Sequence, residues 1–129
     1  MTIVAAVFAG LAALIHVYIF VLESVRWRQP ATWKIFGLTS QADADTTAPL
    51  AYNQGFYNLF LAIGAVIGLV LLFTPAAMAG YALVFLSTGS MLAAALVLVS
   101  TGRDRIRSAA IQGTFPLLSV VFLLISLAV

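Results

Sequence analysis

The chain has 129 residues, of which 64% are hydrophobic and 8% are charged, and its mean hydropathy is +1.14. Soluble domains carry about 25% charged residues, so this composition is typical of a membrane protein, with the lipid bilayer as its expected partner. Six basic residues against four acidic ones give a net charge of +2, which is too little for a nucleic-acid-binding surface. The absence of cysteine excludes disulfides, thiolate metal sites and catalytic thiols.

Four apolar segments follow one another along the chain, at residues 3–22, 50–73, 77–100 and 106–129. Each has the roughly 20 residues that a helix needs to cross the hydrocarbon core of a bilayer. The alternating pattern of a transmembrane β-strand is missing. The sequence therefore predicts an all-α fold, a four-helix bundle that spans the membrane as a single domain over residues 1–129.

The basic residues predict the orientation of the bundle. All of them lie in the first and third connections between spans: Arg26, Arg28, Lys34, Arg103, Arg105 and Arg107. The second connection, around residues 74–76, has none, and neither do the two tails. The positive-inside rule therefore predicts that residues 24–49 and 101–107 are cytoplasmic and that both termini are outside.

The long first connection, residues 24–49, is rich in aromatic residues. Trp27 and Trp33 alternate with basic residues, which is typical of a segment in the headgroup layer. The simpler interpretation is an interfacial loop that anchors the bundle. The alternative is a flap over a cytoplasmic entrance.

Two signals in this connection predict helix starts. Ser40 followed by Asp43 resembles a capping box for one short helical turn. Thr47 and Pro49 have the residue types of an N-cap and a first-turn proline. We therefore expect the second span to begin close to Pro49.

Polar residues fall at similar depths on several predicted spans. His16 and Glu23 are seven residues apart and so share one face of the first helix. The block 53–58, Asn-Gln-Gly-Phe-Tyr-Asn, opens the second span, and an unpartnered amide in hydrocarbon would cost roughly 2–7 kcal/mol. These residues predict a polar pocket that faces the cytoplasmic side. The predicted ligand-binding residues are His16, Asn53, Gln54, Tyr57, Asn58 and Gln112, with Glu23 and Arg105 at the pocket mouth.

The second and fourth spans also carry packing signals. Gly64 and Gly68 share the face of the amides, and this spacing of small residues favours close helix contact. The opposite face, which includes Phe60, suits lipid. In the fourth span, Pro116 frees a backbone carbonyl near Gln112 and predicts a kink there.

Each candidate residue also has a structural interpretation. His16 either handles protons or contacts a ligand, or it is a neutral residue whose hydrogen bonds fix the packing. The amides are either ligand contacts or interhelical hydrogen bonds worth about 0.6–2 kcal/mol each. Glu23 is either an ion-pair partner at the interface or a gate or general base at the pocket mouth. One histidine without cysteine makes a poor zinc site, so no metal or other cofactor is expected.

Four local patterns occur in the order found in a known family. They are His-Val-Tyr-Ile-Phe-Val-Leu-Glu at 16–23, Phe-Gly-Leu at 36–38, the block 53–58 with Phe-Leu-Ala-Ile-Gly at 60–64, and Gln-Gly-Thr-Phe-Pro at 112–116. Over nearly its whole length the chain resembles the bacterial membrane family called domain of unknown function 1304. One departure is Phe115 before Pro116, where the family favours proline followed by alanine. The resemblance implies a four-span protein of the bacterial inner membrane without an established activity.

The sequence leads to three functional hypotheses. In the first, the pocket of a small integral membrane protein binds a small amphiphile, a lipid headgroup or a polar metabolite. In the second, the chain is a subunit of an oligomeric transporter or channel in which His16 and Glu23 relay protons, and self-association is required because four short spans leave little room for an internal pathway. The third is a structural scaffold. An enzyme and a binding protein both stay open, since His16 is the lone plausible acid/base group deep in the predicted bundle.

Overall fold

The computed structural model describes residues 1–128, and over these residues every regular element is helical. The elements are α1 (Thr2–Phe20), the π-helical turn η1 (Val21–Val25), α2 (Pro30–Trp33), α3 (Gln41–Leu71), α4 (Ala77–Ser100), the 3₁₀ turn η2 (Arg103–Arg105) and α5 (Ile106–Ala128). In this described part of the chain, four helical stretches are long and apolar enough to cross a membrane: Thr2–Val25, Gln41–Leu71, Ala77–Ser100 and Arg103–Ala128. The predicted all-α fold class with four membrane-length helices is confirmed, and it indicates a small multi-pass membrane protein.

The chain divides into two compact units. The larger unit contains residues 1–15 and 61–128, and the smaller unit contains residues 16–60. Both α1 and α3 therefore contribute residues to each unit.

The core of the larger unit is built from small side chains. α1 has four buried alanines, and three of them, Ala5, Ala9 and Ala13, lie four positions apart on one face of the helix, where small side chains let the helix backbones approach closely. Parts of all four long helices meet in this core. One buried cluster contains Ala5, Ala9, Leu72, Val84 and Leu123, and a second contains Ala12, Ala13, Ala62, Ala65 and Met91.

The predicted close packing at Gly64 and Gly68 is present in this unit. A Cβ atom added at Gly64 would lie 2.6 Å from Ser87 Oγ, and one at Gly68 would lie 2.8 Å from the backbone nitrogen of Val84. The neighbour at Gly64 is a side chain and the neighbour at Gly68 is backbone, so the backbones of α3 and α4 approach each other most closely at Gly68. Phe60, on the predicted lipid face, is exposed.

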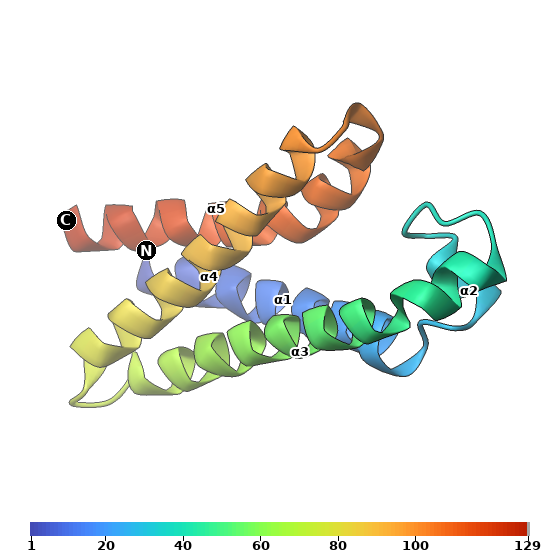
Figure 1. Cartoon of the computed structure of the whole chain (residues 1–129). Helices are drawn as coiled ribbons and strands as arrows, with labels where there is room; N and C mark the ends of the chain where they lie inside the picture. The colour runs from blue at the N-terminus through green and yellow to red at the C-terminus, as the bar shows by residue number, and fades with distance from the viewer. Residues whose placement is uncertain (129) are drawn as a thin grey trace. The chain divides into compact units, whose positions relative to one another are not determined.

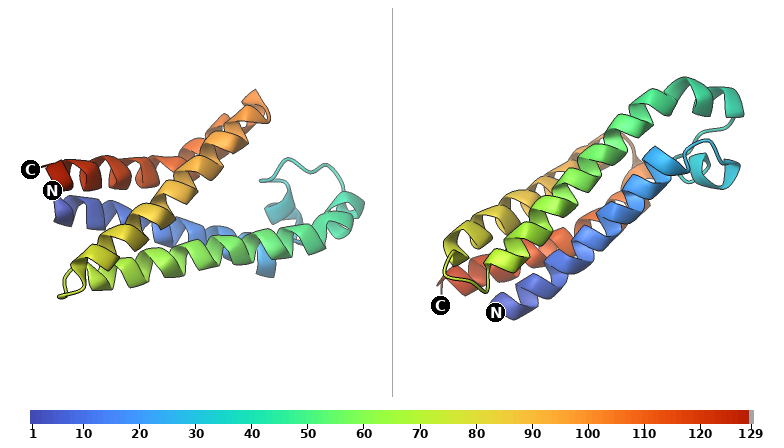
Figure 2. Two further views of the ribbon diagram at one scale, coloured as in Figure 1. Left: turned by 60° about the vertical axis from the view of Figure 1, so that its left-hand side comes forward. Right: turned by 90° about the horizontal axis from the view of Figure 1, so that it is seen from below.

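α4 and α5 form a hairpin in which the two helices pack along each other (Figure 1). At one contact a Cβ atom on Gly113 would lie 2.8 Å from the Cβ of Ala95. α5 bends along its length, as the left view of Figure 2 shows, and Pro116 lies inside this helix. Proline leaves the carbonyl of Gln112 without its helical N–H partner, which accounts for the predicted kink.

The start of α3 differs from the prediction. Ser40 Oγ accepts a hydrogen bond from the Asp43 N–H at 3.1 Å and donates one to Asp43 Oδ2 at 2.7 Å, so Ser40 and Asp43 form a helix N-cap at the predicted position. It begins the whole of α3 at Gln41, however, and not one short turn. The prediction that Thr47 and Pro49 start this helix was wrong. Pro49 lies within α3, and the helix axis changes direction near its N-terminal end (Figure 2).

Candidate functional site

The first membrane-length helix ends in a π turn. The Arg26 N–H donates to the Val21 carbonyl at 2.9 Å, five residues back along the chain. Such turns are rare, and those that occur are often found at functional sites. A π turn holds more residues than an α turn, so Glu23 is rotated away from the position that α-helical periodicity assigns to it. The predicted shared face of His16 and Glu23 assumed an unbroken α-helix, which the chain does not form here.

Glu23, in the π turn, is hydrogen-bonded to Asn58 of α3. Asn58 Nδ2 donates to Glu23 Oε2 at 2.8 Å and to the backbone carbonyl of Gln54 at 3.1 Å. Both side chains are partly buried. The sequence assigned Asn58 to the pocket and Glu23 to its mouth, and within the smaller unit the structure brings these two residues into direct contact.

Gly55 allows the π turn and α3 to lie this close together. A Cβ atom on Gly55 would collide with Ser24 Oγ and would lie 3.1 Å from the Cβ atoms of Glu23 and Ser24. Ser24 Oγ in turn donates to the Tyr52 carbonyl at 2.8 Å. The glycine of the block 53–58 therefore makes room for two hydrogen bonds between the helices.

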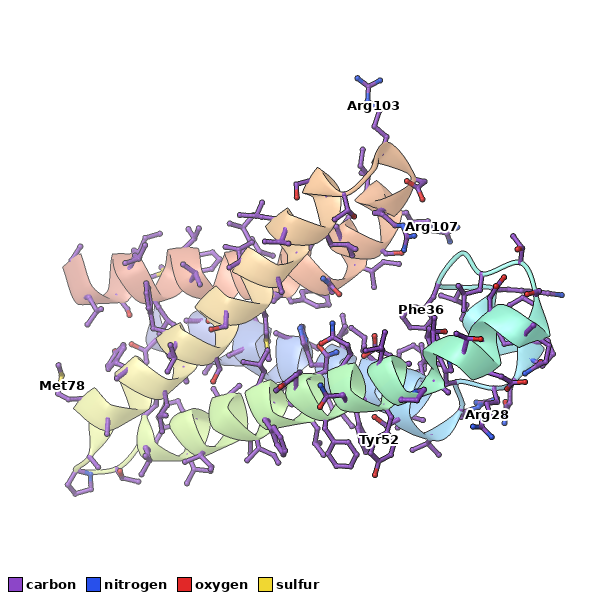
Figure 3. All side chains as sticks on the ribbon, viewed as in Figure 1. Arg28, Phe36, Tyr52, Met78, Arg103 and Arg107 are labelled. Carbon is purple, nitrogen blue, oxygen red and sulfur yellow. The ribbon has the colours of Figure 1, made fainter. Side chains whose placement is uncertain are left out.

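An open cavity of about 360 Å³ lies at this helix contact. Its volume falls within the roughly 300–1,000 Å³ that is usual for small-molecule sites. The wall combines one carboxylate, one guanidinium and two aromatic rings, all from the smaller unit. Two of these side chains, Arg28 and Tyr52, lie on the same side of the unit in Figure 3. The lining residues are Glu23, Ser24, Val25, Trp27, Arg28, Ala48, Pro49 and Tyr52.

The two aromatic walls are held in place by neighbouring residues. Trp27 Nε1 donates to the Ala44 carbonyl at 2.9 Å, and the Trp27 ring lies 4.9 Å from the Phe36 ring. The Tyr52 ring lies 5.0 Å from the Phe56 ring. These contacts preorganise the cavity, because the rings need not be ordered when a ligand binds.

The remaining predicted site residues differ in their surroundings. His16 is buried, with 1% of its surface exposed, whereas Asn53, Gln54 and Tyr57 are exposed. Gln112 is partly buried in α5.

Arg105, in η2, donates from Nε to Asp104 Oδ2 at 3.1 Å. Arg105 and Gln112 belong to the larger unit, whereas Glu23 and Asn58 belong to the smaller one. A common polar layer that joins these four residues stays a prediction.

Of the eight residues that line the cavity, only Glu23 belonged to the predicted site, and none of the six predicted ligand-binding residues lines it. Trp27, Arg28 and Tyr52 are the missed residues whose side chains carry charge or aromatic rings. Trp27 and Arg28 were interpreted as headgroup anchors, and Tyr52 stands directly before the block 53–58. Sequence spacing could have identified Tyr52, because it lies three residues before Gly55 and therefore on the same side of α3. Within residues 1–128, no three His, Asp or Glu side chains gather where they could hold a metal ion.

The profile of the family described as "Protein of unknown function (DUF1304)" matches residues 10–124. No curated protein and no solved structure matches the chain. The matched region contains the π turn, the cavity and the block 53–58. The chain belongs to the DUF1304 family.

Proposed function

We propose that this protein binds a small amphiphile, a lipid headgroup or a polar metabolite in the cavity beside the π turn. The observation that carries the proposal is the cavity itself, which places Glu23, Arg28 and two aromatic rings at the end of a membrane-length helix. Tryptophan and tyrosine are favoured where hydrocarbon meets water. A molecule with a charged head and an apolar tail suits a cavity at that level.

The charges of the cavity favour a polar ligand over a purely apolar one. Glu23 is held by Asn58, while the Arg28 side chain is 73% exposed and lies 3.7 Å from Asp45 Oδ1. An exposed ion pair of this kind contributes little, typically about 0–1 kcal/mol. Arg28 can therefore turn to a ligand at small cost.

The proposed location is the cytoplasmic surface of the bacterial inner membrane. Arg26, Arg28 and Lys34 all lie in the connection that carries the cavity, which supports a cytoplasmic position. His16, Asn53, Gln54 and Tyr57, which belong to the same unit as the cavity, are proposed to extend the site toward the membrane interior.

Native mass spectrometry of the protein purified from its membranes tests the proposal. We expect an amphiphile to co-purify with the wild type and to be lost from Tyr52→Ala, which removes one cavity wall. The matched control is Tyr18→Ala, because Tyr18 is 57% exposed and does not line the cavity. Binding that persists in both Tyr52→Ala and Arg28→Gln would overturn the proposal.

The burial of His16 within a membrane-length helix favours a second candidate, an oligomeric transporter or channel subunit that relays protons through His16 and Glu23. This function predicts a stable oligomer in mild detergent and pH-dependent flux in liposomes. A monomer without flux would reject it.

A further inference from the structure

We infer that the cavity selects a zwitterionic headgroup, an amine joined through a short linker to a phosphate diester. The amine would lie at Glu23 between the rings of Trp27 and Tyr52, and the phosphate at Arg28. This inference rests on the proposed binding function and specifies the ligand class.

The side of the cavity formed by Glu23 has the chemistry of an ammonium site. A carboxylate attracts the positive charge directly, and the faces of tryptophan and tyrosine attract it through their quadrupoles. Trp27 and Tyr52 line the same cavity as Glu23. The hydrogen bond from Asn58 holds Glu23 Oε2, so the carboxylate is oriented before a ligand arrives.

Arg28 has the chemistry of a phosphate site. A planar guanidinium binds phosphate through two parallel hydrogen bonds, which an ammonium group cannot reproduce. Its partner Asp45 Oδ1 lies at 3.7 Å, and both side chains are more than half exposed. A phosphate oxygen can replace this long contact with a shorter one.

The presence of both a positive and a negative side chain in the cavity argues against ligands that carry only one sign of charge. The cavity wall contains one acidic and one basic side chain, so its formal charge is zero. An anionic headgroup at Arg28 would be repelled by Glu23, and a simple amine at Glu23 would be repelled by Arg28. Only a ligand with both charges satisfies both residues, and this is the source of the proposed selectivity.

The test is competition between headgroups on the whole protein in detergent. The protein is mixed with equal amounts of phosphatidylethanolamine, anionic phosphatidylglycerol and uncharged diacylglycerol, and the lipid adducts are measured by native mass spectrometry. We expect phosphatidylethanolamine to dominate on the wild type. Glu23→Gln and Arg28→Gln should each weaken its binding about tenfold, the effect of losing one charge-assisted hydrogen bond.

Two control variants each remove one charge of the same sign at a residue outside the cavity. Lys34→Gln removes an exposed positive charge, and Asp43→Asn removes a negative charge while keeping an acceptor for Ser40. Both should keep the wild-type preference. Arg28 is exposed, so its variant separates loss of binding from loss of folding even if Glu23→Gln folds poorly.

The outcomes separate this inference from the proposed function. Equal binding of phosphatidylglycerol or diacylglycerol that is still lost in Tyr52→Ala would overturn the zwitterion inference and leave the binding function standing. Lipid binding that no cavity variant changes would overturn both. Soluble glycerophosphoethanolamine identifies the source of the headgroup: displacement of the lipid supports recognition of the headgroup alone, and failure to displace it supports recognition of the membrane lipid.

Discussion

Asn58 and Glu23 join α3 to the π turn through a hydrogen bond of 2.8 Å between Asn58 Nδ2 and Glu23 Oε2. The bond ties the block 53–58 to the acidic residue of the cavity wall. It therefore links a packing contact between two helices to the orientation of a group proposed to bind the ligand.

This bond should be measurable as a coupling energy. Asn58→Ala should lower the free energy of unfolding by about 1 kcal/mol, because it removes the donor of the hydrogen bond to Glu23. Glu23→Gln should cost less, since the glutamine carbonyl still accepts from Asn58. Thermal unfolding of Asn58→Ala, of Glu23→Leu and of the double variant that combines them gives the interaction energy. Strictly additive effects of Asn58→Ala and Glu23→Leu would contradict the assigned bond.

Gly55→Ala should destabilise the protein by about 1–3 kcal/mol, as overpacking at a tight contact does. The added methyl group collides with Ser24 Oγ and lies 3.1 Å from the Glu23 Cβ atom, so the two helices must separate. Ser24→Ala in the same chain should restore part of the loss. The control is Gly89→Ala, because a Cβ atom there meets nothing within 4 Å and should stabilise α4 slightly. Equal unfolding temperatures for the two alanine variants would contradict the close approach.

Gly64 and Gly68 should respond differently to the same substitution. A methyl group at Gly68 meets the backbone nitrogen of Val84 at 2.8 Å, and a backbone atom cannot move aside. At Gly64 the obstacle is Ser87 Oγ, which can rotate to another staggered position. We expect Gly68→Ala to lose about 1–3 kcal/mol and Gly64→Ala clearly less, measured by thermal unfolding in detergent. The reverse order would show that α3 and α4 pack in another way.

The absence of native cysteine makes the predicted membrane orientation directly testable. Single cysteines at the exposed positions Thr39, Thr74 and Thr101 report on the three connections between spans. In intact cells, a maleimide that cannot cross the inner membrane should label only the variant at Thr74, because the positive-inside rule assigns the other two connections to the cytoplasm. All three should react after the membrane is opened. Labelling of Thr39 or Thr101 in sealed cells would reject the orientation.

Much of the helical architecture was predictable from the sequence because it depends on length and local chemistry. Each of these features depends on a short continuous stretch of sequence. They are the four apolar runs of membrane length, the helix cap at Ser40 and the close approach at Gly64 and Gly68. The kink in α5 follows in the same way from Pro116. These features need no knowledge of distant contacts.

The parts that could not be predicted depend on a local exception or on a tertiary contact. The π turn at residues 21–25 leaves no mark in the hydrophobic pattern, so the position of Glu23 was predicted from an α-helical periodicity that the chain does not keep there. The start of α3 was misassigned because Pro49 is typical of a first helical turn, yet a longer helix accepts it with a bend. The role of Tyr52 emerges only when the π turn comes to lie against it.

The π turn gives the end of the first membrane-length helix a geometry that differs from the rest of that helix. Before it, Ala5, Ala9 and Ala13 repeat in the phase that turns small residues toward the packed core. Within it, the wider turn offsets Glu23 from that phase, and Asn58 of α3 holds the carboxylate. The alanines belong to the larger unit and the π turn to the smaller one. Substitutions at the alanines should therefore change the packing of the larger unit, whereas substitutions in the π turn should change the orientation of Glu23 in the smaller one.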